Sequence, residues 1–188
     1  PYGFFVKALY YNKKLLAEAG VDGPPKTMDE FMSAAEKVSA LPGKYGYCQR
    51  GGSGAFNAWA MMGATANEDN AFFDKDGNST LGQPDWVAGF QNLIDIYKNG
   101  WSPKDSVNWG YKETVAGFYT GTCAMLDQDA DVLAPTAEHM APDDYGVVPM
   151  PKGKNGKSFP ALTYGSWGIM SASKNKDLAW KFLSALSA

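Results

Sequence analysis

The spacing of apolar and polar positions predicts a helix near residues 27–39. Thr27 and Glu30 have the spacing of a capping box, which marks the N-terminus of a helix. Apolar side chains then recur three and four positions apart, at Phe31, Ala34, Ala35 and Val38. We therefore expect an amphipathic helix whose apolar face packs into a core.

A second and clearer helix is predicted between Gln83 and Gly100. Pro84 suits the first turn of a helix, and Gly100 suits its end. The apolar face is expected to consist of Val87, Phe90, Ile94 and Tyr97. We assign Trp86 to packing, because this helix has an apolar face to fill.

Short apolar runs and further helical patterns alternate along the rest of the chain. Strands are predicted within residues 7–14, 45–51, 122–132, 143–158 and 165–173. Helices are predicted within residues 12–20, 50–64, 111–121 and 175–188. In the last helix the apolar positions are Leu178, Trp180, Phe182 and Leu183, and we assign Trp180, Tyr10 and Tyr11 to packing. Short strands between longer helices indicate an α/β layered domain.

Residues 71–82 read as two short strands joined at Asp76-Gly77, a dipeptide that favours hairpin turns. The same stretch has a superficial likeness to a calcium-binding loop. The likeness fails at Ser79 and Asp85, where the calcium loop requires Gly and Glu. The hairpin is the better interpretation.

Composition narrows the classes of partner. Aromatic residues make up 14% of the chain, including six Trp, so some rings are expected outside the core, where their faces can bind a partner. The net charge is −3 and no cluster of Lys and Arg stands out, which argues against nucleic acid. No apolar run approaches the roughly 20 residues that span a bilayer.

The cysteines and the histidine limit the possible chemistry. Cys48 and Cys123 lie in two predicted strands, and they are expected to form either a disulfide or a pair of buried thiols. His139 is the only histidine and lies in a polar segment, where we expect a surface residue. A zinc site or a nucleophile–histidine pair is therefore hard to build, and we expect no metal and no cofactor.

Four stretches, taken together, resemble a known family. These are "ALYYNKKLLAEAGVDGPPKTMDEFMSAAEKVS", "GFYTGTCAMLDQ", "YGVVPMPKGKNG" and "GSWGIMSASKNKDLAWKFLSAL". In this order they resemble the extracellular solute-binding proteins of ABC importers, the family that includes the maltose-binding protein. One departure is Met28, where the family usually has Trp.

The resemblance implies an α/β fold of the periplasmic-binding-protein type, with two lobes around a cleft. A short mixed sheet flanked by helices is expected. Residues 1–160 would form most of the C-terminal lobe, and residues 161–188 would form a hinge strand and a helix leading towards the other lobe. The chain would thus be a fragment of a longer protein.

The resemblance also implies a function without catalysis. The protein would bind a carbohydrate, such as an oligosaccharide, and deliver it to the membrane permease of an ABC importer. It would lie outside the cell membrane, in the periplasm or as a cell-surface lipoprotein. A carbohydrate-active enzyme or a lectin-like module remains an alternative, because aromatic rings and paired acids would serve these as well.

A sugar needs flat aromatic platforms and side chains that fork onto pairs of hydroxyls, and three places offer them. The first is the glycine-rich segment after the predicted strand at 45–51, with Arg50, Asn57 and Trp59. A surface charge and a core Trp are the alternatives there. The segment lacks the phosphate-binding GxxxxGK[ST] pattern, so a phosphate cradle is a weak interpretation.

The second place is the acidic turn, with Asp127, Gln128 and Asp129. Contact with sugar hydroxyls, a solvated turn, a metal site and paired catalytic carboxylates are all open for it. Asp131 stands where the family often has a stacking Trp.

The third place is the "LTYGSWGIM" stretch, with Tyr164 and Trp167. By resemblance Trp167 lies in the hinge strand and faces the cleft, and its small neighbours would leave the ring face open to a sugar. Packing in the core is the alternative for Trp167.

Overall fold

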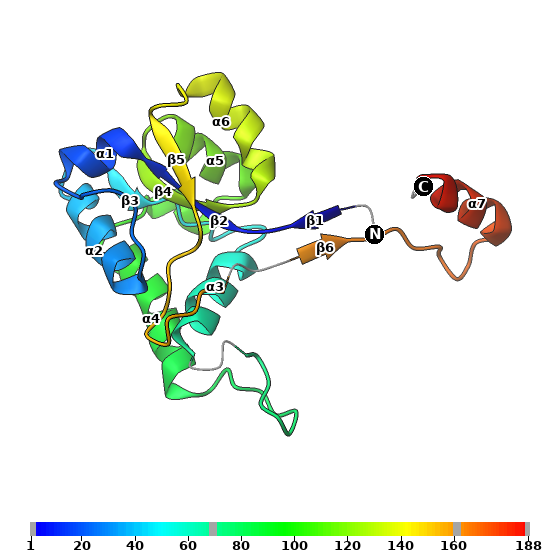
Figure 1. Ribbon diagram of the computed structural model, residues 1–188. Coiled ribbons are helices and arrows are strands. Elements are labelled where there is room, and N and C mark those ends of the chain that lie inside the picture. Colours follow the sequence, from blue (N-terminus) through cyan, green and yellow to red (C-terminus); the bar gives the residue numbers. More distant parts are fainter. Residues whose placement is uncertain (1–2, 68–70, 160–162, 187–188) are drawn as a thin grey trace.

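The computed structural model describes residues 3–67, 71–159 and 163–186, with the side chains of Asn57 and Thr163 left out. Its elements form a mixed sheet between two layers of helices, with a two-stranded arm leaving one end (Figure 1). This is the α/β arrangement predicted from the sequence. No described helix combines the length and apolar character needed to cross a membrane.

The central sheet has the strand order β3-β4-β2-β5. Strand β2 runs antiparallel to β4 and β5, whereas β3 runs parallel to β4. The strands are β2 (Ala8–Asn12), β3 (Tyr45–Tyr47), β4 (Cys123–Gln128) and β5 (Tyr145–Val148). All six residues of β4 are buried, as expected for a strand covered on both faces.

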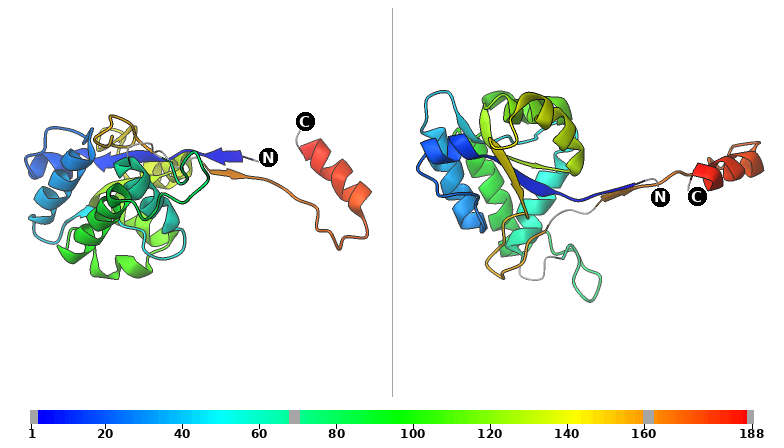
Figure 2. Two further views of the ribbon diagram at one scale, coloured as in Figure 1. Left: turned by 90° about the horizontal axis from the view of Figure 1, so that it is seen from below. Right: turned by 45° about the horizontal axis from the view of Figure 1, so that its top comes forward.

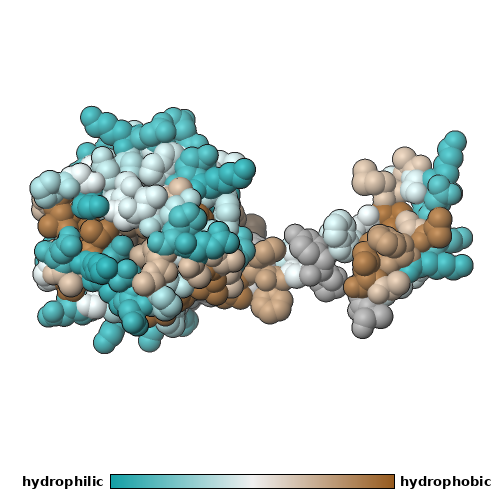
Figure 3. All heavy atoms as spheres, turned by 90° about the horizontal axis from the view of Figure 1, so that it is seen from above, coloured by the Kyte–Doolittle hydropathy of each residue, from teal (hydrophilic) through white to brown (hydrophobic). Residues whose placement is uncertain are grey.

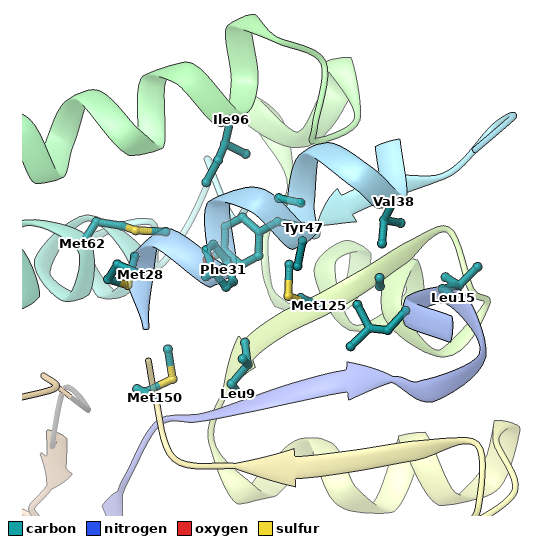
Figure 4. Close-up of a cluster of buried hydrophobic side chains, with 14 of the residues drawn as sticks. Leu9, Leu15, Met28, Phe31, Val38, Tyr47, Met62, Ile96, Met125 and Met150 are labelled. Atoms are coloured by element: carbon teal, nitrogen blue, oxygen red, sulfur yellow. The ribbon is translucent and has the colours of Figure 1, made fainter. Parts of the chain in front are cut away.

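Helices cover both faces of this sheet. The first layer consists of α1 (Lys13–Glu18), α2 (Met28–Ser39), α3 (Phe56–Ala66) and α4 (Pro84–Lys98). These helices and the strands enclose one apolar cluster, in which Phe31, Tyr47 and Met125 point towards each other (Figure 4). The second layer consists of α5 (Tyr111–Tyr119), α6 (Leu133–His139) and the 3-10 turns η1 (Lys104–Asn108) and η2 (Ala130–Val132). It encloses a second cluster with Tyr10, Phe118 and Leu126.

Local sequence signals account for several helix boundaries. The Thr27 side chain accepts a hydrogen bond from the Glu30 amide, and the Glu30 side chain accepts one from the Thr27 amide, so the predicted capping box is confirmed. The predicted apolar face of α2 is buried. Asn12 caps α1 in the same way, through the Leu15 amide.

The predicted apolar face of α4 is wrong at three of its four positions, while the fourth, Phe90, packs on Trp59 and Trp86. Val87, Ile94 and Tyr97 are exposed, and the helix instead buries Trp86, Gly89 and Ile96. A Cβ on Gly89 would lie 2.4 Å from the Met62 carbonyl oxygen, so glycine lets α3 and α4 approach closely at this point. Helix α4 therefore packs on α3 through the face that carries Gly89.

Two other predictions about strands need correction. Residues 71–82 form only one isolated bridge, Phe73↔Ser79, and not two strands, although Gly77 does adopt the positive φ of a turn. The strand predicted at 165–173 ends at Gly165, so Trp167 follows a strand and does not lie in one. The sequence prediction also missed α6, which begins directly after η2.

Cys48 and Cys123 are joined by a disulfide, with their Cα atoms 5.4 Å apart. This settles the alternative left open by the sequence in favour of the bond. Both residues are fully buried in the second cluster. The bond links the end of β3 to the start of β4. It therefore anchors the chain two residues before Arg50.

The arm consists of β1 (Gly3–Phe5), β6 (Thr163–Gly165) and the segment through α7 (Lys176–Leu186). Strands β1 and β6 pair antiparallel, with Phe4 opposite Tyr164. The arm extends away from the sheet, and α7 lies apart from the other helices in every view (Figures 1 and 2). None of the residues of α7 is buried, and Trp180 is 65% exposed, so its assignment to packing is wrong within this chain.

Candidate functional site

Three segments that are distant in sequence meet at the end of the sheet from which the arm leaves (Figure 1). Because β2 and β4 are antiparallel, with Ala8 opposite Gln128, the start of β2 lies beside the end of β4. Because β3 and β4 are parallel, the end of β3 lies there as well. We call this region the site edge, and it comprises Lys7, Gln49, Arg50, Tyr111, Gln128, Asp129 and Asp131.

Lys7 connects the strands at the site edge. Its side chain is buried, with the residue only 3% exposed, and its Nζ donates a hydrogen bond of 2.5 Å to Gln128 Oε1. The same Nζ lies 3.1 Å from Asp129 Oδ2. A buried ammonium is tolerated only when it is paired and hydrogen-bonded, so these contacts fix Gln128 and Asp129 in place.

Asp131, Tyr111 and Arg50 form the open part of the site edge. Burial, followed by the charge of Asp131, raises the pKa of the Tyr111 hydroxyl. Partial burial and the nearby Asp129 carboxylate raise the pKa of Asp131 above its usual value. The Arg50 guanidinium carbon lies 6.0 Å from the centre of the Tyr111 ring, a distance at which a cation–π attraction acts.

The glycine-rich loop that follows β3 positions Arg50. The Gly51 amide donates to the Ser106 carbonyl and the Gly52 amide to the Trp109 carbonyl, each at 2.9 Å. A Cβ on Gly51 would lie 2.5 Å from the Val107 Cα, so this loop and η1 pack backbone against backbone. Arg50 Nε donates to the Ser53 carbonyl oxygen, which fixes the start of the guanidinium group within the loop.

Tyr10 stabilises the acidic turn through a hydrogen bond to its backbone. Its hydroxyl donates a hydrogen bond of 3.2 Å to the Asp129 carbonyl oxygen. Burial, followed by the charges of Asp131 and Asp129, raises the pKa of Tyr10 to about 12. Tyr10 therefore remains a neutral donor at physiological pH and stabilises the backbone of the turn.

Asp127 occupies a deeper position than the other acids. Its side chain is buried, and the Tyr47 hydroxyl donates a hydrogen bond to it. Burial raises the pKa of Asp127, while Lys7 and the Tyr47 hydroxyl act in the opposite direction. Asp127 thus belongs to the support of the site edge and does not form its open surface.

Two buried acceptor atoms at the ends of the strands have no hydrogen-bond donor among the described residues. They are Gln49 Oε1, at the end of β3, and Asp129 Oδ1, at the end of β4. Buried polar atoms are nearly always hydrogen-bonded in folded proteins, and an unpaired one costs on the order of 1–3 kcal/mol. Both atoms are acceptors, so only a group that donates a hydrogen bond could satisfy them.

The aromatic side chains of α3 and α4 form a cluster of their own. Trp59 stacks on Phe90, with ring centres 4.6 Å apart, and it is half-buried. Phe56 packs against Trp59 and is largely exposed at the first turn of α3, after the loop that carries Arg50. Asn57 lies in α3, and its side chain is outside the described residues.

Tyr164 and Trp167 lie on the arm. Tyr164 is 77% exposed in β6, and Trp167 is 59% exposed just after it. Neither ring is packed into the core of this chain. Figure 3 shows apolar surface at the far end of the arm, over α7.

Of the residues proposed from the sequence, Arg50, Gln128 and Asp129 meet at the site edge, with Asp127 beneath them. Trp59 belongs to the aromatic cluster, and Tyr164 and Trp167 belong to the arm. Sequence reasoning missed Lys7 and Tyr111. A lysine directly before a buried strand was the only available signal for Lys7, and Tyr111 at the start of its helix gave none.

The described residues contain no group of three or more acidic, cysteine or histidine side chains arranged to hold a metal ion. A hollow of about 370 Å³ lies elsewhere, where Thr27 and Met28 at the start of α2 face Asp85 and Asn92 of α4. His139 stacks on Tyr119 and is exposed, as expected of a surface residue.

Comparison with known proteins gives a consistent picture. The sequence model of the family described as "Bacterial extracellular solute-binding protein" matches residues 1–188. The sn-glycerol-3-phosphate-binding periplasmic protein UgpB of Yersinia enterocolitica is 32% identical over 187 residues, covering 94% of this chain and 41% of UgpB. A putative binding protein of Brucella abortus is 27% identical over 197 residues, covering 99% of this chain and 45% of the relative.

Solved structures show the same fold. Maltose-bound MalE3 of T. maritima has a TM-score of 0.83 at 25% identity, covering all of this chain and 49% of MalE3. A solute-binding protein of Agrobacterium vitis S4 with bound D-mannitol has a TM-score of 0.74 at 28% identity, covering all of this chain and 46% of that protein. The chain thus spans less than half the length of each of these four proteins.

Proposed function

The chain belongs to the family of bacterial extracellular solute-binding proteins, and from this premise we propose that it binds a carbohydrate for delivery to an ABC importer. We further propose that residues 1–160 form most of one lobe and that the site edge is one wall of the ligand cleft. Residues 161–188 would lead towards the other lobe. The protein would act outside the cell membrane, in the periplasm or as a surface lipoprotein.

One observation carries the proposal: Lys7, Arg50, Gln128 and Asp129 converge at the end of the sheet where β1 and β6 leave the body. In open α/β sheets, ligands bind at strand ends. Carboxylate, amide and guanidinium groups each offer two coplanar acceptors or donors, which suits neighbouring hydroxyls on a sugar. The unpaired acceptors of Gln49 and Asp129 suit the same ligand.

The arm supports the proposed division of the chain. Tyr164, Trp167 and the apolar residues of α7 are exposed, and a stable protein rarely leaves such a surface uncovered. We propose that Tyr164 and Trp167 face the cleft as stacking platforms and that α7 packs on the rest of the protein. Trp59 and Asn57 remain proposed contacts from α3, with Phe56 added because it is exposed beside Trp59.

We propose that the protein is not an enzyme. A glycoside hydrolase needs two carboxyl groups on either side of the bond that it cleaves. Asp129 is paired with Lys7, and Asp131 lies in η2, the turn that Asp129 begins, so the two carboxylates lie on one side of any bound sugar. This arrangement favours binding over proton transfer, although an enzyme remains the alternative that the experiment below separates.

The test is calorimetry on the full-length protein with a panel of oligosaccharides and polyols, followed by chromatography of the recovered ligand. We expect at least one ligand to bind and to be recovered intact. The 188-residue chain should bind the same ligand far more weakly, because half a cleft offers half of the contacts. Cleaved ligand would support the enzyme, and equal affinity of the two proteins would contradict the two-lobed cleft.

A matched pair of variants locates the site. Arg50→Ala should weaken binding about tenfold or more, since a charge-assisted hydrogen bond contributes roughly 1.5–3 kcal/mol. Lys37→Ala removes an exposed cation at the far end of α2 and should leave the affinity unchanged. If both variants bind like the wild-type protein, the site edge does not contact the ligand.

A further inference from the structure

The charges of the site edge balance in number but differ in exposure. Two cations, Lys7 and Arg50, stand against two carboxylates, Asp129 and Asp131. Asp131 is exposed, whereas Lys7 is buried, so a negative charge faces incoming molecules. An anion that approaches this wall therefore meets the exposed Asp131 carboxylate, which repels it.

Both cations are already engaged within the protein. Lys7 is 3% exposed, and its ammonium contacts Gln128 and Asp129, so it cannot reach a ligand without breaking a buried pair. Arg50 donates from Nε to the Ser53 carbonyl and lies over the Tyr111 ring. Only the outer nitrogens of Arg50 remain to neutralise a ligand.

The unpaired atoms of the site edge also favour a neutral hydroxyl group over an anion. Gln49 Oε1 and Asp129 Oδ1 are acceptors, and they lack donors among the residues that the structure describes. A hydroxyl can donate a hydrogen bond to such an atom. A phosphate monoester near neutral pH carries a charge of about −1.5 to −2 and offers mainly acceptor oxygens, so it would oppose these atoms.

We propose that this protein selects an uncharged, polyhydroxylated carbohydrate and discriminates against phosphate monoesters at the site edge. This inference rests on the proposed function and narrows its ligand class. The proposed ligand differs from the one in the name of the relative UgpB, which is sn-glycerol-3-phosphate. The basis is the charge and the acceptor character of this chain's own residues.

The test uses matched pairs of probes on the full-length protein: glycerol with sn-glycerol-3-phosphate, mannitol with mannitol 1-phosphate, and maltose with maltose 1-phosphate. Calorimetry should show a neutral member binding at least about tenfold more tightly than its ester. An ester that binds as tightly as its neutral partner, or more tightly, overturns the inference alone. Failure of every probe to bind counts against the carbohydrate function on which the inference rests.

A variant pair ties the discrimination to the site edge. Asp131→Asn removes one negative charge and keeps the size of the side chain, so the ester should gain affinity severalfold while the neutral sugar changes little. Asp143→Asn makes the same charge change before β5, at the opposite end of the sheet, and should change neither affinity. Equal effects of the two variants would mean that net charge, and not the site edge, governs the selection.

Raising the salt concentration provides a second readout. Screening weakens the repulsion between exposed charges. The gap between the neutral sugar and its ester should therefore narrow in the wild-type protein and narrow less in the Asp131→Asn variant. A gap that does not respond to salt would place the selection in shape and not in charge.

Discussion

The body of the molecule, residues 7–159, and its arm carry similar sequence patterns but bury them to very different degrees. Helix α2 in the body buries five residues, among them Phe31 and Val38, whereas α7 in the arm buries none. Both helices are amphipathic in sequence. The difference teaches that an apolar face specifies what a helix can pack against, while burial requires a partner surface.

Two tryptophans make the same comparison at single residues. Trp86 on α4 is fully buried and contacts Phe72 and Phe90, with ring centres 4.9 and 5.5 Å away. Trp180 on α7 is 65% exposed. The ring is the same, but only Trp86 has a closely packed environment to lose.

The largest expected effect breaks this comparison directly. In the 188-residue chain, Trp86→Ala should lower the free energy of unfolding by about 3–5 kcal/mol, because it leaves a cavity between α3 and α4. Trp180→Ala should change it by less than about 0.5 kcal/mol, as for other exposed positions. Urea denaturation of both variants measures this. A large loss for Trp180→Ala would mean that α7 packs on the body in solution.

The next effect sharpens the comparison within the arm, at the residues that follow β6. Trp167→Ala in the full-length protein should weaken carbohydrate binding by roughly ten- to a hundredfold, because stacking and burial of a ring face contribute on the order of 1–3 kcal/mol. Stability should change little, because the ring is 59% exposed in this chain. Calorimetry and the denaturation midpoint are measured together. Intact affinity with a large loss of stability would make Trp167 a packing residue.

The smallest effect concerns pH at the base of the site edge. Burial raises the pKa of Asp127 above its unfolded value of 3.8, so the folded protein holds this proton more tightly than the unfolded chain. The resulting stability is present below pH 3.8 and is lost as pH rises through the folded pKa. Asp127→Asn does not titrate, so its stability relative to wild type should increase with pH across this window.

Urea titrations of the wild-type protein and Asp127→Asn at a series of pH values measure this relative stability. If the stability of Asp127→Asn relative to wild type falls as pH rises, the prediction is wrong. Tyr47→Phe gives a second measurement. The Tyr47 hydroxyl lowers the pKa of Asp127, so its removal should enlarge the pH-dependent loss. If the loss is not enlarged, the Tyr47 hydroxyl does not lower the pKa of the Asp127 carboxyl group.

Much of the secondary structure follows from local signals. The capping box at Thr27, the strand before Asn12 and the helix that starts at Pro84 needed only a few neighbouring residues. The buried face of α4 could not be predicted in this way. Its sequence offers two apolar stripes, and Gly89 decides between them only when α3 lies against it.

The candidate site was predictable in part. Arg50, Gln128 and Asp129 stand at strand ends, where ligand contacts are expected, and the structure places them at one edge. Lys7 also stands at a strand end, but nothing in the sequence joined it to the acidic turn, because its partner Gln128 lies 121 positions away. The openness of Asp131 and the burial of Asp127 likewise depend on what packs around each carboxylate.

The sequence by itself determined the order of the elements, the caps and turns, and the membership of the family, because these depend on residues close together in the chain or on the pattern as a whole. Only the tertiary structure decided which face of α4 is buried, that Cys48 bonds to Cys123, and that Lys7 holds the acidic turn. Each of these depends on atoms that distant segments bring within a few ångströms. Burial, hydrogen bonding and electrostatic attraction act over that distance and not along the sequence.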